Sequence, residues 1–264
     1  MIVEAGEAEA RPKIIGARVQ RVEDPRMLTG HGTFIDDISL SHTLHIAFAR
    51  SDHAHAHITG IETAEAAAMP GVYGVFTASD ITDLFQPIRA TSRMVDYYAT
   101  ELPVLAGSKV RFVGEPVVAV AAESRYLAED AVERIAISYE ELGAVIDPVA
   151  AAEPDAPVLH DDVGSNVILT RTFQRGDVDE VIETAPVRVG DSFRMRRKTP
   201  TAMENRGYLA DYDQGRRALT LHSTSQVPGV VRDALVEMLD IPGNRLRVVA
   251  PDVGGGFGGK GALY

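Results

Sequence analysis

Short apolar runs with strand periodicity alternate along the chain with short helical patterns. In the first half, alternating positions predict strands at residues 44–50, 56–61, 72–77, 117–122 and 135–139. Helices fit between them at 63–69, which stops at Pro70-Gly71, and at 125–134, after a Ser124 cap. These elements predict a mixed α/β module at residues 26–150. The strand positions expected to be buried are Ile46, Val75, Val118, Val120 and Ile137.

A segment rich in Pro, Asp and Glu follows the module at residues 147–162, and its prolines disfavour a helix or a central strand. We therefore expect an N-terminal arm at 1–25, the module at 26–150, a linker at 151–165 and a second unit at 166–264. Period-two patterns in that unit predict strands at 167–173, 187–195, 208–212, 218–225 and 245–250. One helix is expected from Pro228, with an apolar stripe that ends before Pro242-Gly243.

Composition narrows the classes of function. A formal net charge of -12 at pH 7 opposes binding to nucleic acid, which requires clustered Lys and Arg. The sequence has no Cys, which excludes disulfides and Cys-ligated iron–sulfur clusters within these residues. No apolar run approaches the roughly 18 residues that span a bilayer, and the first residues lack a leader pattern. We expect a cytoplasmic protein that binds neither nucleic acid nor membrane.

Three histidines alternate in the segment SDHAHAHI, at His53, His55 and His57. A strand would point all three to one side, as a metal site might require. Side chains on one face of a strand are spaced about 7 Å apart, however, and no acid or Cys completes a ligand set. We interpret them as imidazoles on a half-exposed strand face.

The glycine-rich segment VGGGFGGK at residues 253–260 is the strongest local signal. Three of its glycines fit the dinucleotide pattern G-x-G-x-x-G, but the sequence provides neither the following helix nor an acidic residue about 20 positions on. A P-loop requires Ser or Thr after Lys260, where Gly261 stands. We interpret the segment as a loop whose amides approach an anionic or oxo ligand, with Phe257 as an apolar wall, and the alternative is a flexible loop. A nucleotide-binding enzyme is kept as an alternative.

Six segments, in order, resemble the molybdenum-binding subunit of the xanthine dehydrogenase, aldehyde oxidase and carbon monoxide dehydrogenase family. They are RVEDPRMLTGHGTFIDDI (21–38), SDHAHAHI (51–58), VRFVGEPVVAVAAESRYLAEDA (110–131), MENR (203–206), STSQVP (223–228) and DVGGGFGGK (252–260). The resemblance covers nearly the whole chain. It implies an α+β fold, with an a/b hammerhead domain at 26–150 followed by the first part of a mixed α/β molybdopterin-binding domain.

The resemblance also implies a function. The complete enzyme would oxidise an aldehyde or N-heterocycle, a small-molecule substrate, with water as the oxygen source. Its cofactor would be molybdenum-molybdopterin in the cytosine dinucleotide form, with FAD on a medium subunit and [2Fe-2S] on a small iron–sulfur subunit. The residues that the family places beside this cofactor correspond to Gln226, Gly255, Gly256, Phe257 and Gly258. Glu204 and Arg206 are interpreted as a structural ion pair.

Two departures from the family pattern limit what this chain does alone. Gly261 stands where purine-oxidising members carry a substrate-binding Glu, so the substrate is left open. Family subunits continue for several hundred residues beyond the glycine loop, and that part holds the catalytic base. No catalytic residue or metal ligand is therefore assigned to this chain, and we expect it to be inactive without the remainder of the subunit. We expect a fragment, a truncation or half of a split subunit; the competing hypothesis is a non-catalytic assembly or interaction protein.

Overall fold

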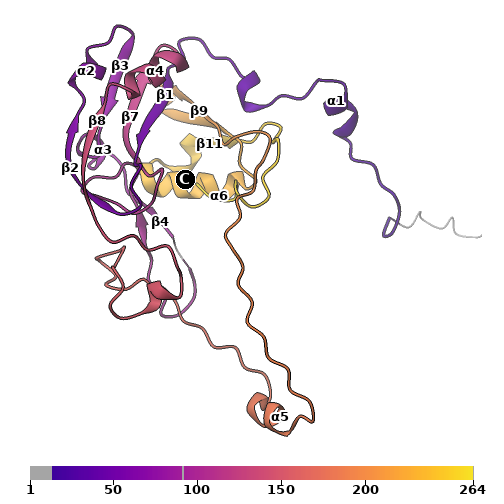
Figure 1. Ribbon diagram of the computed structural model, residues 1–264. Coiled ribbons are helices and arrows are strands. Elements are labelled where there is room, and N and C mark those ends of the chain that lie inside the picture. Colours follow the sequence, from indigo (N-terminus) through magenta and orange to yellow (C-terminus); the bar gives the residue numbers. More distant parts are fainter. Residues whose placement is uncertain (1–13, 91, 264) are drawn as a thin grey trace, which may run out of the picture.

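The computed structural model describes residues 14–90 and 92–263, and within them short elements form several small sheets (Figure 1). The helices are α1 Asp24–Leu28, α2 Ala64–Ala67, α3 Ala78–Ile81, α4 Arg125–Val132, α5 Val178–Thr184 and α6 Pro228–Leu239. The strands are β1 His45–Arg50, β2 Ala56–Glu62, β3 Val72–Phe76, β4 Ile88–Arg89, β5 Glu101–Leu102, β6 Lys109–Val110, β7 Pro116–Ala122, β8 Ala136–Glu141, β9 Tyr208–Asp213, β10 Ala218–Ser223 and β11 Leu246–Val249. Mixed helix and strand content confirms the expected α+β class.

The first unit is built on two antiparallel three-stranded sheets, ordered β1-β7-β3 and β6-β2-β8, and α4 packs on β1 and β7. Strand β7 is central because its apolar residues face partners on both sides: Val117 and Val118 contribute to the core shared with β2 and β6, and Val120 packs against α2 and α4. The predicted cap of α4 is confirmed, since Ser124 Oγ accepts the Leu127 N–H at 3.2 Å.

The five strands predicted in this unit are present, but the face of β1 was assigned wrongly. Ile46 was expected to be buried and is 63% exposed, whereas Ala49 of the same strand is buried. The core face of β1 carries small side chains because α4 packs against this strand. Successive residues of a strand point to opposite faces, so with Ala49 on the core face Ile46 points outward.

The second sheet system, β11-β10-β9, follows the linker and supports α6. Strand β10 pairs in parallel with β11 and antiparallel with β9. Helix α6 starts at Pro228 as expected, buries Val231 and Met238, and ends at Asp240 in the left-handed conformation (φ 50°). The main-chain N–H of Gln86 donates to the Met238 carbonyl at 2.9 Å, which joins this unit to the first.

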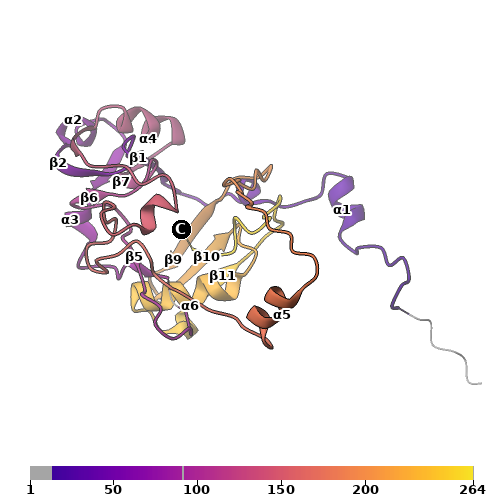
Figure 2. The ribbon, with the colours of Figure 1, turned by 60° about the horizontal axis from the view of Figure 1, so that its bottom comes forward.

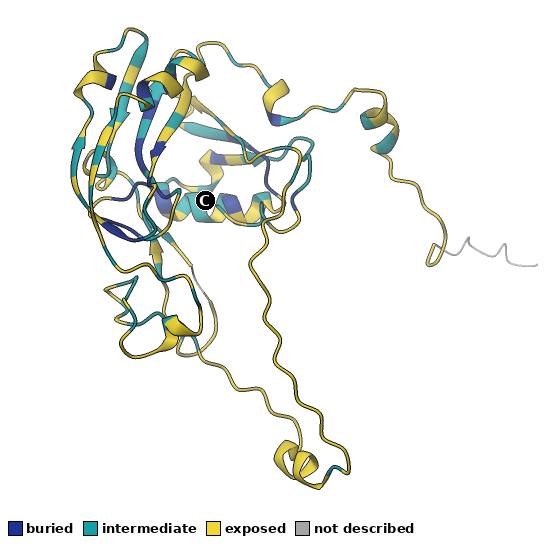
Figure 3. Ribbon diagram, in the orientation of Figure 1, coloured by how far each residue is buried: buried dark blue, intermediate teal, exposed yellow. Residues whose placement is uncertain are grey.

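Two predicted strands are wrong. Residues 167–173 and 187–195 lie outside any strand, in a long excursion that carries α5 away from the sheets (Figures 1 and 2). A strand forms only where a neighbouring segment pairs with it through a ladder of hydrogen bonds, and among the described residues neither segment has one. Residues 167–173 make one such contact, from the Tyr98 N–H to the Ile168 carbonyl at 3.0 Å. The excursion is almost entirely exposed (Figure 3), so the alternation of apolar side chains, including Phe193 and Met195, remains unburied.

The linker is ordered by side-chain contacts. Asn166 accepts the Leu159 N–H at 3.0 Å and donates to the carbonyls of Ala151 and Pro157. The buried Lys109 ammonium reaches Asp161 at 2.5 Å, and this contact lowers the pKa of the Asp161 carboxyl. None of the helices in the described ranges has the length and apolar character to cross a membrane.

Candidate functional site

The glycine-rich loop follows β11 and lies across the turn between β10 and α6. The turn residues Thr224 and Ser225 are buried beside the end of β10. The Gln226 N–H donates to the Lys260 carbonyl at 2.9 Å, and the Gly207 N–H donates to Thr224 Oγ1 at 3.0 Å. Segments from three regions of the second unit therefore meet at this turn, and the loop is fastened to it by main-chain contacts.

The side chain of Gln226 holds the far end of the loop. Its oxygen, Oε1, accepts the Gly258 N–H at 3.0 Å and the Lys260 N–H at 3.3 Å. Because main-chain N–H groups only donate, the atom that faces them must be the amide oxygen, which fixes the orientation of the side chain. The NH₂ group of Gln226 is consequently left available on an exposed residue.

A buried ion pair braces both ends of the loop. Lys260, only 4% exposed, places its ammonium 2.9 Å from Glu204 Oε2, and the same oxygen accepts the Gly254 N–H at 2.8 Å. Glu204 was expected to pair with Arg206, but the ion pair seen for its carboxylate is with Lys260. Sequence reasoning missed this brace, since Lys260 was considered only as a P-loop lysine. An isolated Lys directly after a glycine run was the available signal.

Several glycines are required by close packing. A Cβ on Gly254 would lie 2.5 Å from Glu204 Cβ, and one on Gly259 would lie 2.7 Å from Pro200 Cγ. A Cβ on Gly256 would lie 2.5 Å from Gln226 Cγ. The loop is thus pressed onto side chains at both of its fastening points, where no other residue type fits without a shift.

The centre of the loop offers unused donors. Among the described residues, no hydrogen-bond partner is found for the N–H groups of Gly255, Gly256 and Phe257, although the amides on either side are engaged. Neutral N–H donors beside the Gln226 amide suit an anionic or oxo-bearing group, so the residues present fit the molybdopterin group that the resemblance implies. Phe257 is 76% exposed and its φ is 49°, and its role as an apolar wall stays a prediction.

The predicted site residues lie together, and the other candidate groups lie elsewhere. A cavity of about 470 Å³ is lined by residues that include Lys109, Arg111 and His160, at the junction of the first unit and the linker. His55 is buried against the Gly143 carbonyl, and only His57 lies within β2. Within residues 14–90 and 92–263, no group of three or more His, Cys, Asp or Glu has a geometry suited to a metal ion.

Comparison with known proteins assigns both units. The model of the aldehyde oxidase and xanthine dehydrogenase a/b hammerhead domain matches residues 29–143, and the molybdopterin cofactor-binding domain model matches residues 159–264. The chain is similar to the nicotine 6-hydroxylase large subunit of Paenarthrobacter nicotinovorans, with 40% identity over 95% of this chain and 31% of that subunit. It is 36% identical to the carbon monoxide dehydrogenase large chain of Hydrogenophaga pseudoflava, over 98% of this chain and 34% of the relative.

The fold is shared with solved enzymes. The crystal structure of quinoline 2-oxidoreductase from Pseudomonas putida 86 superposes with a TM-score of 0.86 at 40% identity, over 92% of this chain and 31% of that chain. The chain therefore spans about a third of the length of these relatives. Two matching domain models in the expected order, together with these relatives, show that the chain belongs to the molybdenum hydroxylase family of aldehyde oxidases, xanthine dehydrogenases and carbon monoxide dehydrogenases.

Proposed function

We propose that this chain forms one side of the molybdenum cofactor site in the large subunit of a molybdenum hydroxylase. The observation that carries the proposal is the orientation of Gln226. Its oxygen is held by the Gly258 and Lys260 amides, so its NH₂ group is presented as a donor beside a loop whose central amides are also unused. An array of neutral donors binds oxygen, sulfur and phosphate acceptors without altering the charge of the group it holds.

In this proposal, the residues of this chain bind and orient the cofactor. When bound, the molybdenum-molybdopterin group, which we propose is the cytosine dinucleotide form, supplies the oxidation chemistry. Gln226 would donate from its NH₂ group, and Gly255, Gly256 and Phe257 would donate from their main-chain N–H groups. The amide of Gly258 is already engaged by Gln226, so its contribution is the turn made possible by φ 87°.

The complete enzyme would oxidise an aldehyde or N-heterocycle with oxygen from water. Nicotine and quinoline appear in the names of two relatives, and both are N-heterocycles. Because these 264 residues contain no Cys, any Cys-ligated [2Fe-2S] cluster of the complex must be held by residues outside them. We therefore propose a complex with the remainder of the molybdenum subunit, an FAD-binding medium subunit and a small iron–sulfur subunit, with boundaries in this chain near residues 26–150 and 166–264.

The test is purification of the chain, through an affinity tag, from the organism that encodes it. Molybdenum, cytosine nucleotide released from the pterin, FAD and iron are then measured per chain, together with oxidation of aldehydes and N-heterocycles. We expect all four components in the purified complex. A complex that contains iron and FAD but no molybdenum would contradict the proposal and favour a non-catalytic assembly role.

A matched pair of variants tests the assigned contact. Gln226→Ala removes a donor and the anchor of the loop, and we expect a loss of about 1 to 3 kcal/mol of interaction, seen as lower molybdenum content and turnover. Gln214→Ala, in the exposed turn between β9 and β10, is the control and should leave both unchanged. Equal molybdenum content and turnover in the two variants would remove Gln226 from the site.

A further inference from the structure

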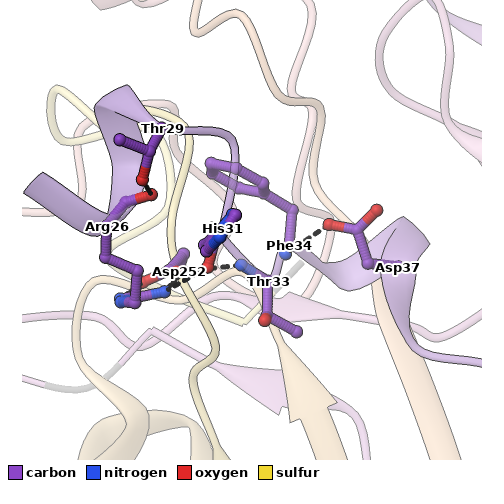
Figure 4. A network of polar contacts seen from close by, with 7 residues as sticks. All are labelled: Arg26, Thr29, His31, Thr33, Phe34, Asp37 and Asp252. Carbon is purple, nitrogen blue, oxygen red and sulfur yellow. Dashed lines mark hydrogen bonds and ion pairs between the residues drawn. The ribbon is translucent and has the colours of Figure 1, made fainter.

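The segment from α1 to residue 33, far from the second unit in sequence, is attached to the start of the glycine loop. Arg26 donates from both terminal nitrogens to the two carboxylate oxygens of Asp252, at 2.5 and 2.6 Å. These residues are 226 positions apart in the sequence. Figure 4 shows the two side chains facing one another, with the chain from His31 to Thr33 passing beside them.

The carboxylate of Asp252 receives a third donor, and the two main chains also pair. The Thr33 N–H donates to Asp252 Oδ2 at 2.7 Å, and the Asp252 N–H donates to the Thr33 carbonyl at 2.9 Å. The Asp252 side chain is only 11% exposed. The Arg26 guanidinium, together with the Thr33 N–H, lowers the pKa of Asp252 to about 2, so the contact is fully ionised at neutral pH.

The segment that carries Arg26 is shaped in advance for this contact. Helix α1 begins with Pro25 in its first turn, and Thr29 Oγ1 donates back to the Pro25 carbonyl at 2.8 Å. The chain then turns at Gly30, with φ 77°, so that the His31 carbonyl accepts a second contact from Arg26 at 3.2 Å. The Arg26 side chain therefore contacts its own segment at the His31 carbonyl while it pairs with Asp252.

The contact between Arg26 and Asp252 affects the glycine loop because Asp252 lies just before it. Asp252 precedes Gly254 by two residues, so it holds the entry of the loop together with Glu204, whereas Gln226 and Lys260 hold the exit. Five glycines between these points have no Cβ to restrict their main chain, so anchoring at both ends must set the loop conformation. Exposed pairs such as Arg125–Glu129 join residues within one helix turn and therefore do not connect distant segments.

We infer that Arg26 and Asp252 are positioning residues, which hold the glycine loop in the conformation that receives the molybdopterin group. This inference rests on the proposed function. The N-terminal segment is then a working part of the cofactor site, although none of its residues is assigned to cofactor contact.

The experiment compares Arg26→Ala, Arg26→Lys and Asp252→Asn with wild type, with Arg125→Ala as a control that breaks an exposed pair of α4. Amide hydrogen exchange is followed in the full chain over residues 252–261, with β10 and α6 as internal references. We expect exchange in the loop to accelerate about tenfold or more in Arg26→Ala and Asp252→Asn, without change in the references. Arg26→Lys should be intermediate, because an ammonium cannot make the two parallel contacts of a guanidinium.

Molybdenum content of the tagged complex is measured for the same variants and separates the two proposals. Faster loop exchange with reduced molybdenum supports the inference. Loop exchange within twofold of wild type in both Arg26→Ala and Asp252→Asn overturns it, and so does faster exchange with normal molybdenum content. A wild-type complex without molybdenum contradicts the proposed function instead, while the exchange result still reports on the contact itself.

Discussion

Glycines in one loop serve different purposes, and the structure separates them. Gly254, Gly256 and Gly259 are needed because a Cβ would enter a neighbouring side chain. Gly255 and Gly258 are needed because their φ values, 101° and 87°, lie in the left-handed region that other residues avoid. Glycines in the same loop are thus required for two different reasons: packing against neighbouring side chains, or a positive φ angle of the main chain.

The packing constraint is testable at Gly256. Gly256→Ala would place a methyl group against Gln226, so the loop or the glutamine must move, and we expect a loss of about 1 to 3 kcal/mol in the free energy of unfolding. Gly229→Ala, inside α6 with open space around its Cβ, is the matched control and should be neutral or stabilising by up to about 1 kcal/mol. Urea unfolding of both variants gives the comparison. Equal stability of the two would show that the loop is not pressed onto Gln226.

A second residue-scale prediction concerns Glu115, which is 1% exposed and lies directly before β7. Burial raises the pKa of Glu115 above its ordinary 4.5, although the Arg111 N–H donates to it at 2.6 Å. The native state therefore keeps a proton that the unfolded state loses, and stability falls as pH rises from 4.5 through the raised folded-state pKa. Glu115→Gln removes this titration.

We accordingly expect the thermal stability of Glu115→Gln to improve relative to wild type as pH rises through that window. Melting temperatures are measured at several pH values from about 4 to 8, which includes the range of about 5 to 8 where most proteins are most stable. Glu133→Gln, on an exposed position after α4, is the control. A stability difference between Glu115→Gln and wild type that stays constant with pH would show that the carboxyl titrates alike in both states.

At the scale of elements, the sequence predicts structure well where local pattern and tertiary partner agree. The strand at 117–122 was found because Val118 and Val120 alternate towards a core that exists, and α4 was found from the Ser124 cap. Residues 187–195 alternate equally well, but no strand among the described residues pairs with them. Periodicity records which side chains share a face, and it does not record whether another strand lies alongside.

The same limit applies to the candidate site. Gln226 and the glycine loop were selected from their motifs, and the structure brings them into contact. The brace from Glu204 to Lys260 and the grip of Arg26 on Asp252 were missed, because each joins residues far apart in the sequence. A single sequence does not indicate which distant residues pair, even though all four of these residues lie within the motifs identified in the sequence.

The exposed excursion leads to a prediction about proteolysis. Residues 171–198 carry several exposed Arg and Lys residues and almost no buried contacts, so trypsin should cut there first. Sites within β6 to α4 should resist, since Lys109 is buried and the main chain around it is paired. Mass spectrometry of early fragments identifies the cuts. A first cut within residues 109–134 would contradict the prediction that residues 171–198 are cleaved first.

The whole molecule presents a cofactor surface that is open on one side. The loop donors are neutral, Phe257 is exposed, and the cavity near Lys109 lies away from them. We therefore expect the 264-residue chain, produced alone, to retain no molybdenum and to oxidise no aldehyde. Metal analysis of the purified chain is the measurement, with the tagged complex as the positive control. Near-equimolar molybdenum in the chain alone would contradict the prediction.

The excursion that carries α5 also sets a practical limit on handling the chain. Val187, Val189, Phe193 and Met195 are exposed and alternate along a segment that pairs with no strand among the described residues, so the segment offers a free apolar edge. Such an edge recruits an identical edge from another molecule, and the encounter is bimolecular, so losses grow with concentration. Asp191 interrupts the apolar row, and neighbouring arginines add repulsion between copies. Dilute storage at low salt, where that repulsion is least screened, should therefore preserve the chain longest.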